Sequence, residues 1–326
     1  MKKFFIAVTV LALICLWAVS QQNSSTIIIY SSMEQFRGEA LQEQLNEEFP
    51  DLHVKVVYAS TGKSAAKLSV EGEKTDADII VGLETGYMTR VIDIMAPMSH
   101  LSEINYIDEF NPSIFDNQAV IWERYGGSLI INTDVLEKYD LPLPKTYQDL
   151  LDPIYKDKIA MPDPKSSGTG YFFYKSLVNE FGVEGALDYF DALHPNIKQF
   201  TESGSGPIKL LNQGEIAIAM GMTFQAVNEI NKGMPFELVF PELGSPYNTS
   251  ATSMLKGREN DPDVVHVYTY IINEAFLIDK DLYSPEQVYK DQVNKIEKYP
   301  EHIPYANMEG IHSIDEKDRL LEQWKY

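Results

Sequence analysis

Cysteine is almost absent from this sequence, since Cys15 is the one cysteine among 326 residues. It lies within an apolar segment near the N-terminus. The rest of the chain can therefore form no disulfide and has no thiolate nucleophile or thiolate metal ligand. A chain of this length can bury a core that needs no covalent crosslink. The shortage of cysteine therefore excludes thiol chemistry. It does not indicate a small or unstable protein.

Basic residues are also scarce. The chain has 27 Lys and Arg against 48 Asp and Glu, which gives a formal net charge of −21 at pH 7. Because a nucleic-acid binder needs a basic face to neutralise phosphates, we expect no nucleic-acid partner. The apolar fraction of 44% is ordinary for a globular protein and excludes a largely disordered chain. The length suggests about two domains.

Several motifs that mark catalysis or nucleotide binding are missing. The chain has no G-x-G-x-x-G, no G-x-x-x-x-G-K-[ST], no G-x-S-x-G and no H-E-x-x-H. Its six histidines are scattered, and its carboxylates are too numerous to single out an acid–base pair. We therefore predict no catalytic residue, no metal site and no cofactor. An enzyme on the same fold stays an alternative.

The N-terminus has the pattern of an export signal. Lys2 and Lys3 precede an apolar run at 4–19, which ends in a small-residue cleavage site before a polar stretch. We predict a signal peptide at 1–20 and a protein in the periplasm or at the outer face of the cytoplasmic membrane. Lipid anchoring through Cys15 and retention of the segment as a membrane anchor are the alternatives.

Apolar runs of strand type alternate with helical periodicity along the chain. Strands are expected at 26–30, 54–58, 77–81, 126–132, 158–161, 215–222 and 236–240. Helices are expected after the first three strands and at 134–139, 171–181, 223–230, 264–276, 285–296 and 316–324. This alternation is typical of α/β folds with doubly wound, mostly parallel sheets.

The order of these elements predicts a two-lobed clamp. We expect the first lobe at 26–125 plus 255–326 and the second lobe at 133–236. Two extended crossover strands, 126–132 and 237–254, join them. Such a clamp closes on a ligand in the cleft between its lobes. We expect a monomer.

Hydroxyl residues and glycines gather where the expected strands turn into helices. Ligands of parallel sheets bind at these carboxyl ends of the strands. The candidate ligand-binding residues there are Ser31, Ser32, Ser60, Thr61, Gly62, Ser166, Ser167, Gly168, Thr169, Ser203, Gly204, Ser205 and Thr223. Hydroxyls and free N–H groups at helix N-termini can bind an anion without any charged side chain. Taken alone, each of these turns is equally well explained by a serine or threonine that caps the following helix.

Several of these segments resemble bacterial extracellular solute-binding proteins of ABC importers. More narrowly they resemble the iron(III), phosphonate and sugar-phosphate branch, with a periplasmic-binding-protein-like type II fold. The resemblance rests on IIIYSSMEQ, YASTGKSAAKL, DADIIVGLETGYM, MPDPKSSGTGYFF, FTESGSGPIKLLNQGEIAIAMG and VFPELGSPYNTSATSMLKGREN. It implies an exported substrate-binding component whose partners are a small anionic ligand and ABC permease subunits in the membrane.

The resemblance also bears on the ligand. Iron-binding members carry two adjacent tyrosines after a strand of the second lobe, where this chain has Phe224 within 222–225. Glu84 matches a glutamate of the family's third turn. The resemblance therefore favours a phosphorylated or phosphonate ligand, such as 2-aminoethylphosphonate or a sugar phosphate. Glu84 or Glu242 would face the amine or hydroxyl group of that ligand.

Two alternatives stay open. In one, the protein binds iron(III) without the tyrosine pair, and Tyr171, Tyr174 or Tyr247 are then the first candidates for a phenolate ligand. In the other, the chain is a surface interaction protein with a vestigial cleft.

Overall fold

The computed structural model describes residues 26–98, 104–111, 114–115 and 117–326. The predicted signal peptide at 1–20 and Cys15 lie outside the described residues. Within the described part of the chain, no helix has the length and apolar character needed to cross a membrane. The strands are β1 (Ile27–Ser31), β2 (Val54–Tyr58), β3 (Ile79–Glu84), β4 (Val120–Asn132), β5 (Ile159–Pro162), β6 (Ile197–Thr201), β7 (Ile218–Met222), β8 (Phe236–Val239) and β9 (Tyr247–Met254).

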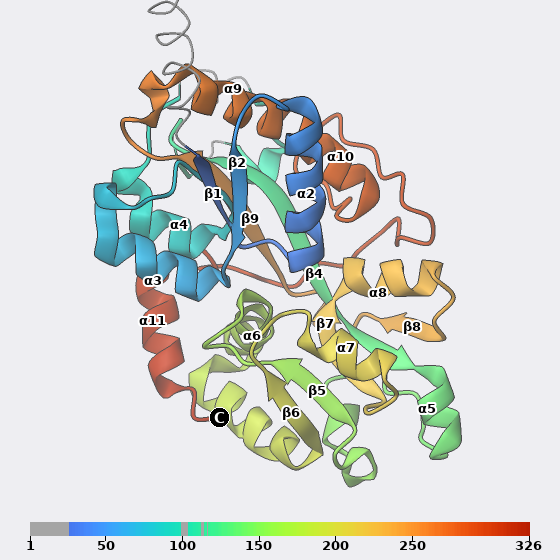
Figure 1. Ribbon diagram of the computed structural model, residues 1–326. Helices are drawn as coiled ribbons and strands as arrows, with labels where there is room; N and C mark the ends of the chain where they lie inside the picture. The colour runs from blue at the N-terminus through green and yellow to red at the C-terminus, as the bar shows by residue number, and fades with distance from the viewer. Residues whose placement is uncertain (1–25, 99–103, 112–113, 116) are drawn as a thin grey trace, which may run out of the picture.

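Ten α-helices cover these strands within the described residues. They are α2 (Gln35–Glu48), α3 (Thr61–Glu71), α4 (Thr85–Val91), α5 (Thr133–Lys138), α6 (Gly168–Leu193), α7 (Gly206–Asn212), α8 (Thr223–Asn231), α9 (Pro262–Tyr270), α10 (Phe276–Leu282) and α11 (Ile314–Gln323). A π-helical turn, Ile271–Ala275, joins α9 to α10. The elements form two lobes, with β1–β3 in the upper lobe and β5–β7 in the lower lobe of Figure 1.

Strand pairing runs in the order β2-β1-β3-β9-β4-β7-β5-β6, with β8 also paired to β4. The outer strands pair in parallel: β1 with β2 and β3, and β5 with β6 and β7. Pairing is antiparallel around β4 and β9. The paired strands of the two lobes form one continuous series because β4 pairs with strands of both lobes. Its first half pairs with β9, and its second half pairs with β7 and β8.

The chain crosses between the lobes over shorter segments than the crossovers predicted at 126–132 and 237–254. Residues 127–132 already pair with β7 and β8, and 247–254 is β9, which pairs with β3 and β4. The crossings lie at Gly126–Gly127 and in the loop that ends at Pro246. They are adjacent, because the N–H of Gly127 donates to the carbonyl of Pro246 at 2.7 Å.

One predicted helix is wrong and one strand was missed. Residues 285–296 form no helix. The Gln292 side chain instead donates to the carbonyls of Pro285 and Glu286 and accepts from the N–H of Val288. The apolar positions of this segment do not share a buried face, since Val288 is buried whereas Val293 is 70% exposed. The missed strand is β6, which pairs in parallel with β5.

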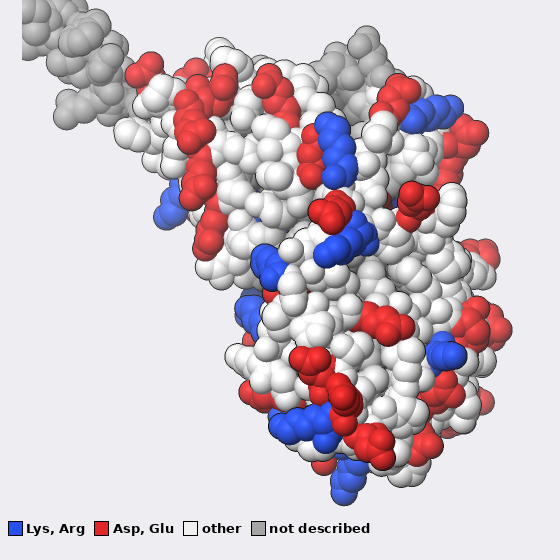
Figure 2. Space-filling view, turned by 90° about the vertical axis from the view of Figure 1, so that its right-hand side faces the viewer, with Lys and Arg blue, Asp and Glu red and all other residues white. Residues whose placement is uncertain are grey.

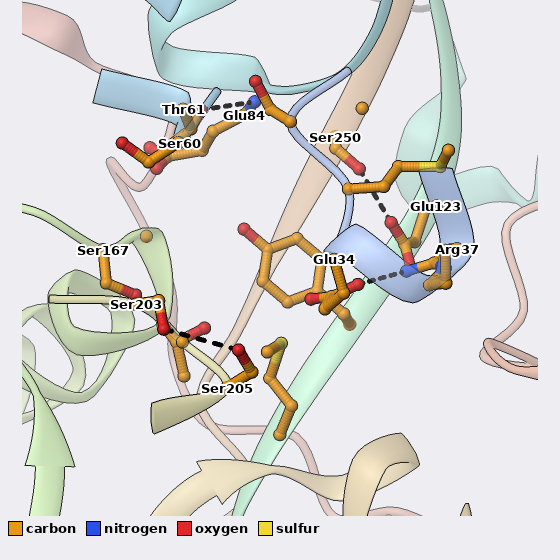
Figure 3. Close-up of a pocket in the computed structure, with 18 of the residues that line it drawn as sticks. Glu34, Arg37, Ser60, Thr61, Glu84, Glu123, Ser167, Ser203, Ser205 and Ser250 are labelled. Atoms are coloured by element: carbon orange, nitrogen blue, oxygen red, sulfur yellow. Dashed lines mark hydrogen bonds and ion pairs between the residues drawn. The ribbon is translucent and has the colours of Figure 1, made fainter. Parts of the chain in front are cut away.

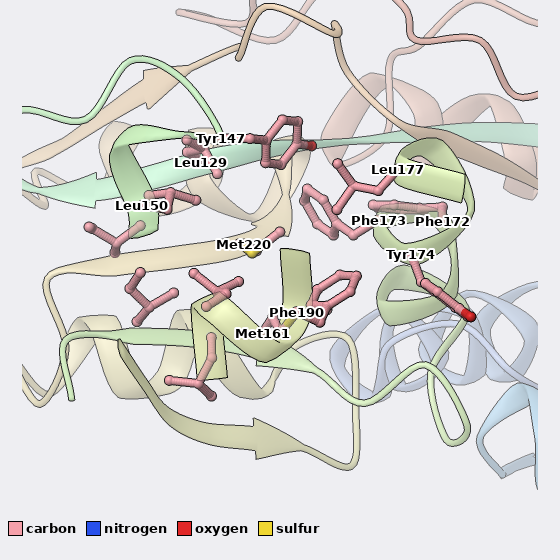
Figure 4. Packing of buried hydrophobic residues seen from close by; sticks show 14 of the residues in the cluster. Leu129, Tyr147, Leu150, Met161, Phe172, Phe173, Tyr174, Leu177, Phe190 and Met220 are labelled. Atoms are coloured by element: carbon pink, nitrogen blue, oxygen red, sulfur yellow. The ribbon is translucent and has the colours of Figure 1, made fainter. Parts of the chain in front are cut away.

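Each lobe has its own core. In the first lobe, α2 and α9 pack on one face of the sheet, and α3 and α4 pack on the other. In the second lobe, α6 places Phe172, Phe173, Tyr174 and Leu177 among residues of β4, β5 and β7 (Figure 4). These cores fix the strands, so the turns at their carboxyl ends are held in place.

The C-terminal helix departs from the predicted division, which placed all of 255–326 in the first lobe. Helices α9 and α10 do pack there, and Phe276 stacks on Trp122 with ring centroids 4.2 Å apart. Helix α11, in contrast, places Leu320 in the core of the second lobe, together with Trp324 directly after the helix. The chain ends beside that lobe in Figure 1.

Candidate ligand-binding site

A cavity of about 80 Å³ lies between the two lobes. One water occupies roughly 10–15 Å³ on this measure, so the cavity has room for a chemical group of several non-hydrogen atoms. Its lining residues come from both lobes: Ser32, Met33, Glu34, Arg37, Tyr58, Ser60, Thr61, Gly82, Glu84, Glu123, Tyr125 and Ser250 from the first, and Ser166, Ser167, Gly168, Thr169, Ser203, Gly204, Ser205 and Met222 from the second.

Most of the predicted candidates meet at this cavity. Those that line it are Ser32, Ser60, Thr61, Glu84, Ser166, Ser167, Gly168, Thr169, Ser203, Gly204 and Ser205. They belong to strand-to-helix turns that are up to 173 positions apart in the sequence. Parallel strands within each lobe bring the turns of that lobe to one edge, and the two edges face each other across the cleft.

Four predicted residues do not line the cavity, namely Ser31, Gly62, Thr223 and Glu242. Ser31 is fully buried within β1. Gly62 follows the lining residue Thr61, and a Cβ atom added to it would contact the hydroxyl of Tyr87. Thr223 donates from Oγ1 to Oγ of Ser128 at 3.2 Å. Glu242 accepts the N–H of Tyr147 at 3.2 Å, so it fixes a loop of the second lobe.

Two long helices from different lobes begin at the cavity. Ser60 precedes α3, and Ser167 precedes α6. Neither serine uses its hydroxyl to cap its own helix. An ordinary N-cap serine would bond to a backbone N–H of the first turn. The hydroxyls of Ser60 and Ser167, together with the unpaired N–H groups of the two first turns, are therefore free to meet a ligand.

Acidic residues and one arginine form another wall of the cavity (Figure 3). The Arg37 guanidinium donates to Glu123 at 2.7 Å, to Glu34 at 3.0 Å and through Nε to Asp279 at 2.9 Å. Burial opposes the charge of Arg37, yet Asp279 and Glu123 raise its pKa well above its usual range. Ser250 donates to the other oxygen of Glu123 at 3.0 Å. This cluster is a set of mutually satisfied charges.

The cluster determines how the cavity can attract an anion. Among the described residues, Arg37 is the one Lys or Arg that lines the cavity, and it is engaged by three carboxylates. No lining cation is left over for a ligand. The remaining donors are hydroxyls and backbone N–H groups, which act over short distances.

Two buried oxygens at the cavity have no hydrogen-bond partner among the described residues. They are Oγ of Ser32 and Oε2 of Glu84. Buried polar atoms are nearly always paired in folded proteins. These two atoms therefore indicate where a ligand would make polar contacts.

Phe224 takes the place of the tyrosine pair that the resemblance to iron-binding members implies. Phe224 is buried, and its ring lies 5.2 Å from the guanidinium carbon of Arg37. The fallback candidates Tyr171, Tyr174 and Tyr247 lie away from the cavity lining. Tyr125, which sequence reasoning missed, does line it, but burial and then Glu84 raise its pKa, so its phenolate form is disfavoured. Within the described residues, no group of three or more His, Cys, Asp or Glu side chains could hold a metal ion.

Residues 30–275 match the family described as bacterial extracellular solute-binding protein. The chain belongs to this family. Its members are transport components, which supports an extracytoplasmic substrate-binding role in an ABC importer.

Similar sequences include an uncharacterized protein of Haemophilus influenzae. It is 28% identical to this solute-binding protein over 248 residues, which are 74% of this chain and 71% of the relative. The thiamine-binding periplasmic protein of Brucella abortus is 26% identical over 214 residues, 63% of this chain and 60% of that protein. Both similarities are consistent with the family.

Solved structures show the same fold. The periplasmic binding protein P5PA has a TM-score of 0.78 at 22% identity, covering 92% of this chain and 98% of that one. AfuA from Actinobacillus pleuropneumoniae, with fructose-6-phosphate bound, has a TM-score of 0.77 at 24% identity and the same coverage. The predicted two-lobed, periplasmic-binding-protein-like α/β fold is thus confirmed.

Proposed function

We propose that this solute-binding protein captures a ligand by its phosphate or phosphonate group and delivers it to ABC permease subunits. The observation that carries the proposal is the meeting of the α3 and α6 N-termini, one from each lobe, with serine hydroxyls that cap neither helix. Helix N-termini with free N–H groups favour anions. A ligand held by both would also hold the lobes together.

The charge of the whole protein supports short-range recognition. The net charge of −21 gives no long-range attraction for an anion. On the face seen in Figure 2, acidic and basic residues are interspersed without a broad basic patch. Hydrogen bonds from neutral donors to a charged group contribute roughly 1.5–3 kcal/mol each. A few such bonds from Ser60, Thr61, Ser167 and Thr169 would give useful affinity despite the acidic surface.

The rest of the ligand faces carboxylates. Glu84 and the Glu34–Glu123 side of the arginine cluster line the same cavity as the hydroxyls. A ligand whose anionic group is joined to an ammonium or hydroxyl group would satisfy both walls. We therefore propose 2-aminoethylphosphonate or a sugar phosphate as the ligand class.

Calorimetry on the purified protein tests this proposal. Inorganic phosphate, fructose 6-phosphate and 2-aminoethylphosphonate are titrated first. Thiamine and iron(III) citrate represent the other ligands associated with similar proteins. We expect at least one phosphorylated or phosphonate compound to bind. Binding of thiamine or iron alone would refute the proposal.

The variant Thr61→Asp places a charge at the anion position. Oγ1 of Thr61 accepts the N–H of Glu84 at 3.1 Å, and an aspartate keeps an acceptor there while adding a carboxylate. We expect binding to be abolished by charge repulsion. Ser69→Asp is the matched control, because it adds the same charge to the exposed far end of α3. Equal affinity in both variants would contradict an anion site at Thr61.

A further inference from the structure

Helix α11 connects the two lobes next to the cavity through three consecutive side chains. Glu316 pairs with Lys175 of α6 at 2.9 Å, and Asp318 pairs with Arg90 of α4. Lys317, between them, pairs with Glu84 at the end of β3. The hydrophobic side of α11 is fixed independently, since Leu320 and Trp324 pack in the second-lobe core.

Lys317 lies at the junction of the lobes. Both it and Glu84 are 1% exposed, so the ion pair is fully buried. Its Nζ lies 4.2 Å from the ring centre of Tyr87 in α4 and 4.3 Å from that of Tyr171 in α6. Burial lowers the pKa of Lys317, and Glu84 opposes that shift. A charge in this place is stable because Glu84 and the two ring faces surround it.

The carboxylate of Glu84 has two unequal oxygens. Oε1 accepts from Lys317, whereas Oε2 is buried without a hydrogen-bond partner among the described residues. Oε2 lies against Gly168, the first residue of α6, where a Cβ atom would come within 2.6 Å of it. The free oxygen of a first-lobe residue therefore lies at the second-lobe helix terminus where the anionic group is proposed to bind.

We propose that Oε2 of Glu84 accepts a hydrogen bond from an ammonium or hydroxyl group of the ligand, and that Lys317 is the positioning residue that makes this possible. The inference rests on the proposed function and specifies its ligand as an anion that also carries a donor. Without Lys317, Oε1 of Glu84 loses its ion-pair partner, so the carboxylate is no longer held with Oε2 toward the ligand. The C-terminal helix therefore contributes to specificity without touching the ligand.

A pair of probes that differ in the donor group tests the inference. Calorimetry compares 2-aminoethylphosphonate with ethylphosphonate, which lacks the ammonium. We expect the wild-type protein to prefer 2-aminoethylphosphonate at least tenfold. Glu84→Gln and Lys317→Met should each reduce that preference to about twofold or less. The double variant should match Glu84→Gln, because Lys317 acts through Glu84.

Rescue by a variant that keeps the cation separates positioning from a structural role. Lys317→Arg keeps a cation beside Oε1 of Glu84 and should retain most of the preference, whereas Lys317→Met should lose it. Lys175→Met is the matched control, since it removes the neighbouring α11 ion pair and leaves Glu84 untouched. It should keep the wild-type preference.

Three results would overturn the inference. They are an unchanged preference in Glu84→Gln, an unchanged preference in Lys317→Met, and an equal loss in Lys175→Met. If Lys317→Met does not fold, Lys317→Gln and the single Glu84→Gln variant still decide the matter. Failure of both phosphonates to bind the wild type overturns this inference, and failure of inorganic phosphate and fructose 6-phosphate as well overturns the proposed function. Binding of both probes with no effect of the variants overturns this inference alone.

Discussion

Replacing Gly168 by alanine tests whether the lobes approach as closely as the structure shows. A Cβ atom there would lie 2.6 Å from Oε2 of Glu84 and 3.1 Å from the hydroxyl of Tyr125. Ordinary contact begins at 3.4 Å, so the carboxylate would have to move by roughly 0.8 Å. Its other oxygen is held by Lys317. The strain therefore arises where the Glu84 carboxylate of the first lobe contacts the start of α6 in the second lobe.

The size of the effect follows from known costs of overpacking. One extra carbon in a tightly packed site typically costs about 1–3 kcal/mol. Because this cost falls on the closed, ligand-bound arrangement, affinity for the bound phosphonate should drop roughly 5- to 150-fold. Gly168 lies in a helical turn without positive φ, so alanine adds no backbone strain. The thermal midpoint of the ligand-free protein should therefore change little.

Gly62→Ala is the matched control. Gly62 also lies in the first turn of a helix at the cleft, but its added Cβ would meet the Tyr87 hydroxyl at 3.6 Å, an ordinary contact. Replacing a helical glycine by alanine typically stabilises by about 0.4–1 kcal/mol. We expect unchanged affinity and a slightly higher thermal midpoint. Wild-type affinity in Gly168→Ala, measured by calorimetry beside this control, would refute the close-contact argument.

Three further predictions follow from buried groups. Arg37→Met leaves three carboxylates without their cation, so the free energy of unfolding measured in urea should fall by about 3–5 kcal/mol. An unchanged urea midpoint would contradict this. Burial lowers the pKa of His312, so the unfolded chain binds protons more readily below about pH 6.5 and stability should fall as the pH is lowered. His312→Gln should weaken that dependence in denaturant titrations, and His53→Gln, at an exposed position, should not. Addition of iron(III) citrate should produce no tyrosinate-to-iron absorbance band, because 222–225 carries Phe224 and no tyrosine where iron-binding members carry the pair. A band would return iron to consideration.

Sequence reasoning located the hydroxyl wall because its signal is local. An apolar strand followed closely by Ser-Thr-Gly or Ser-Ser-Gly predicts both a turn and the start of the next helix. Ser60 and Ser167 therefore came to the cavity as expected. The same rule failed at Ser31, which is part of β1 rather than the turn, because a boundary error of one residue reverses the side-chain direction in a strand.

The charged wall was missed because its members are brought together by tertiary structure. Arg37 and Asp279 are 242 positions apart, and Arg37 and Glu123 are 86 apart. In the sequence, Arg37 looks like a solvent-facing residue of an amphipathic helix. One signal was available: Glu123 and Arg124 interrupt a strand that is otherwise apolar and aromatic from 120 to 125. Paired charges inside such a strand indicate a buried polar network.

The distribution of buried charge explains how so acidic a protein can present an anion site. Arg37 and Lys317 are neutralised before a ligand arrives, Arg37 by its three carboxylates and Lys317 by Glu84. The donors that remain for an anion are dipolar: hydroxyls and backbone N–H groups at the starts of α3 and α6. Such donors select by geometry within a few ångströms. Specificity in this cleft is therefore expected to depend on how well a ligand matches the positions of these donors and of the free oxygen of Glu84, and only weakly on the net charge of either molecule.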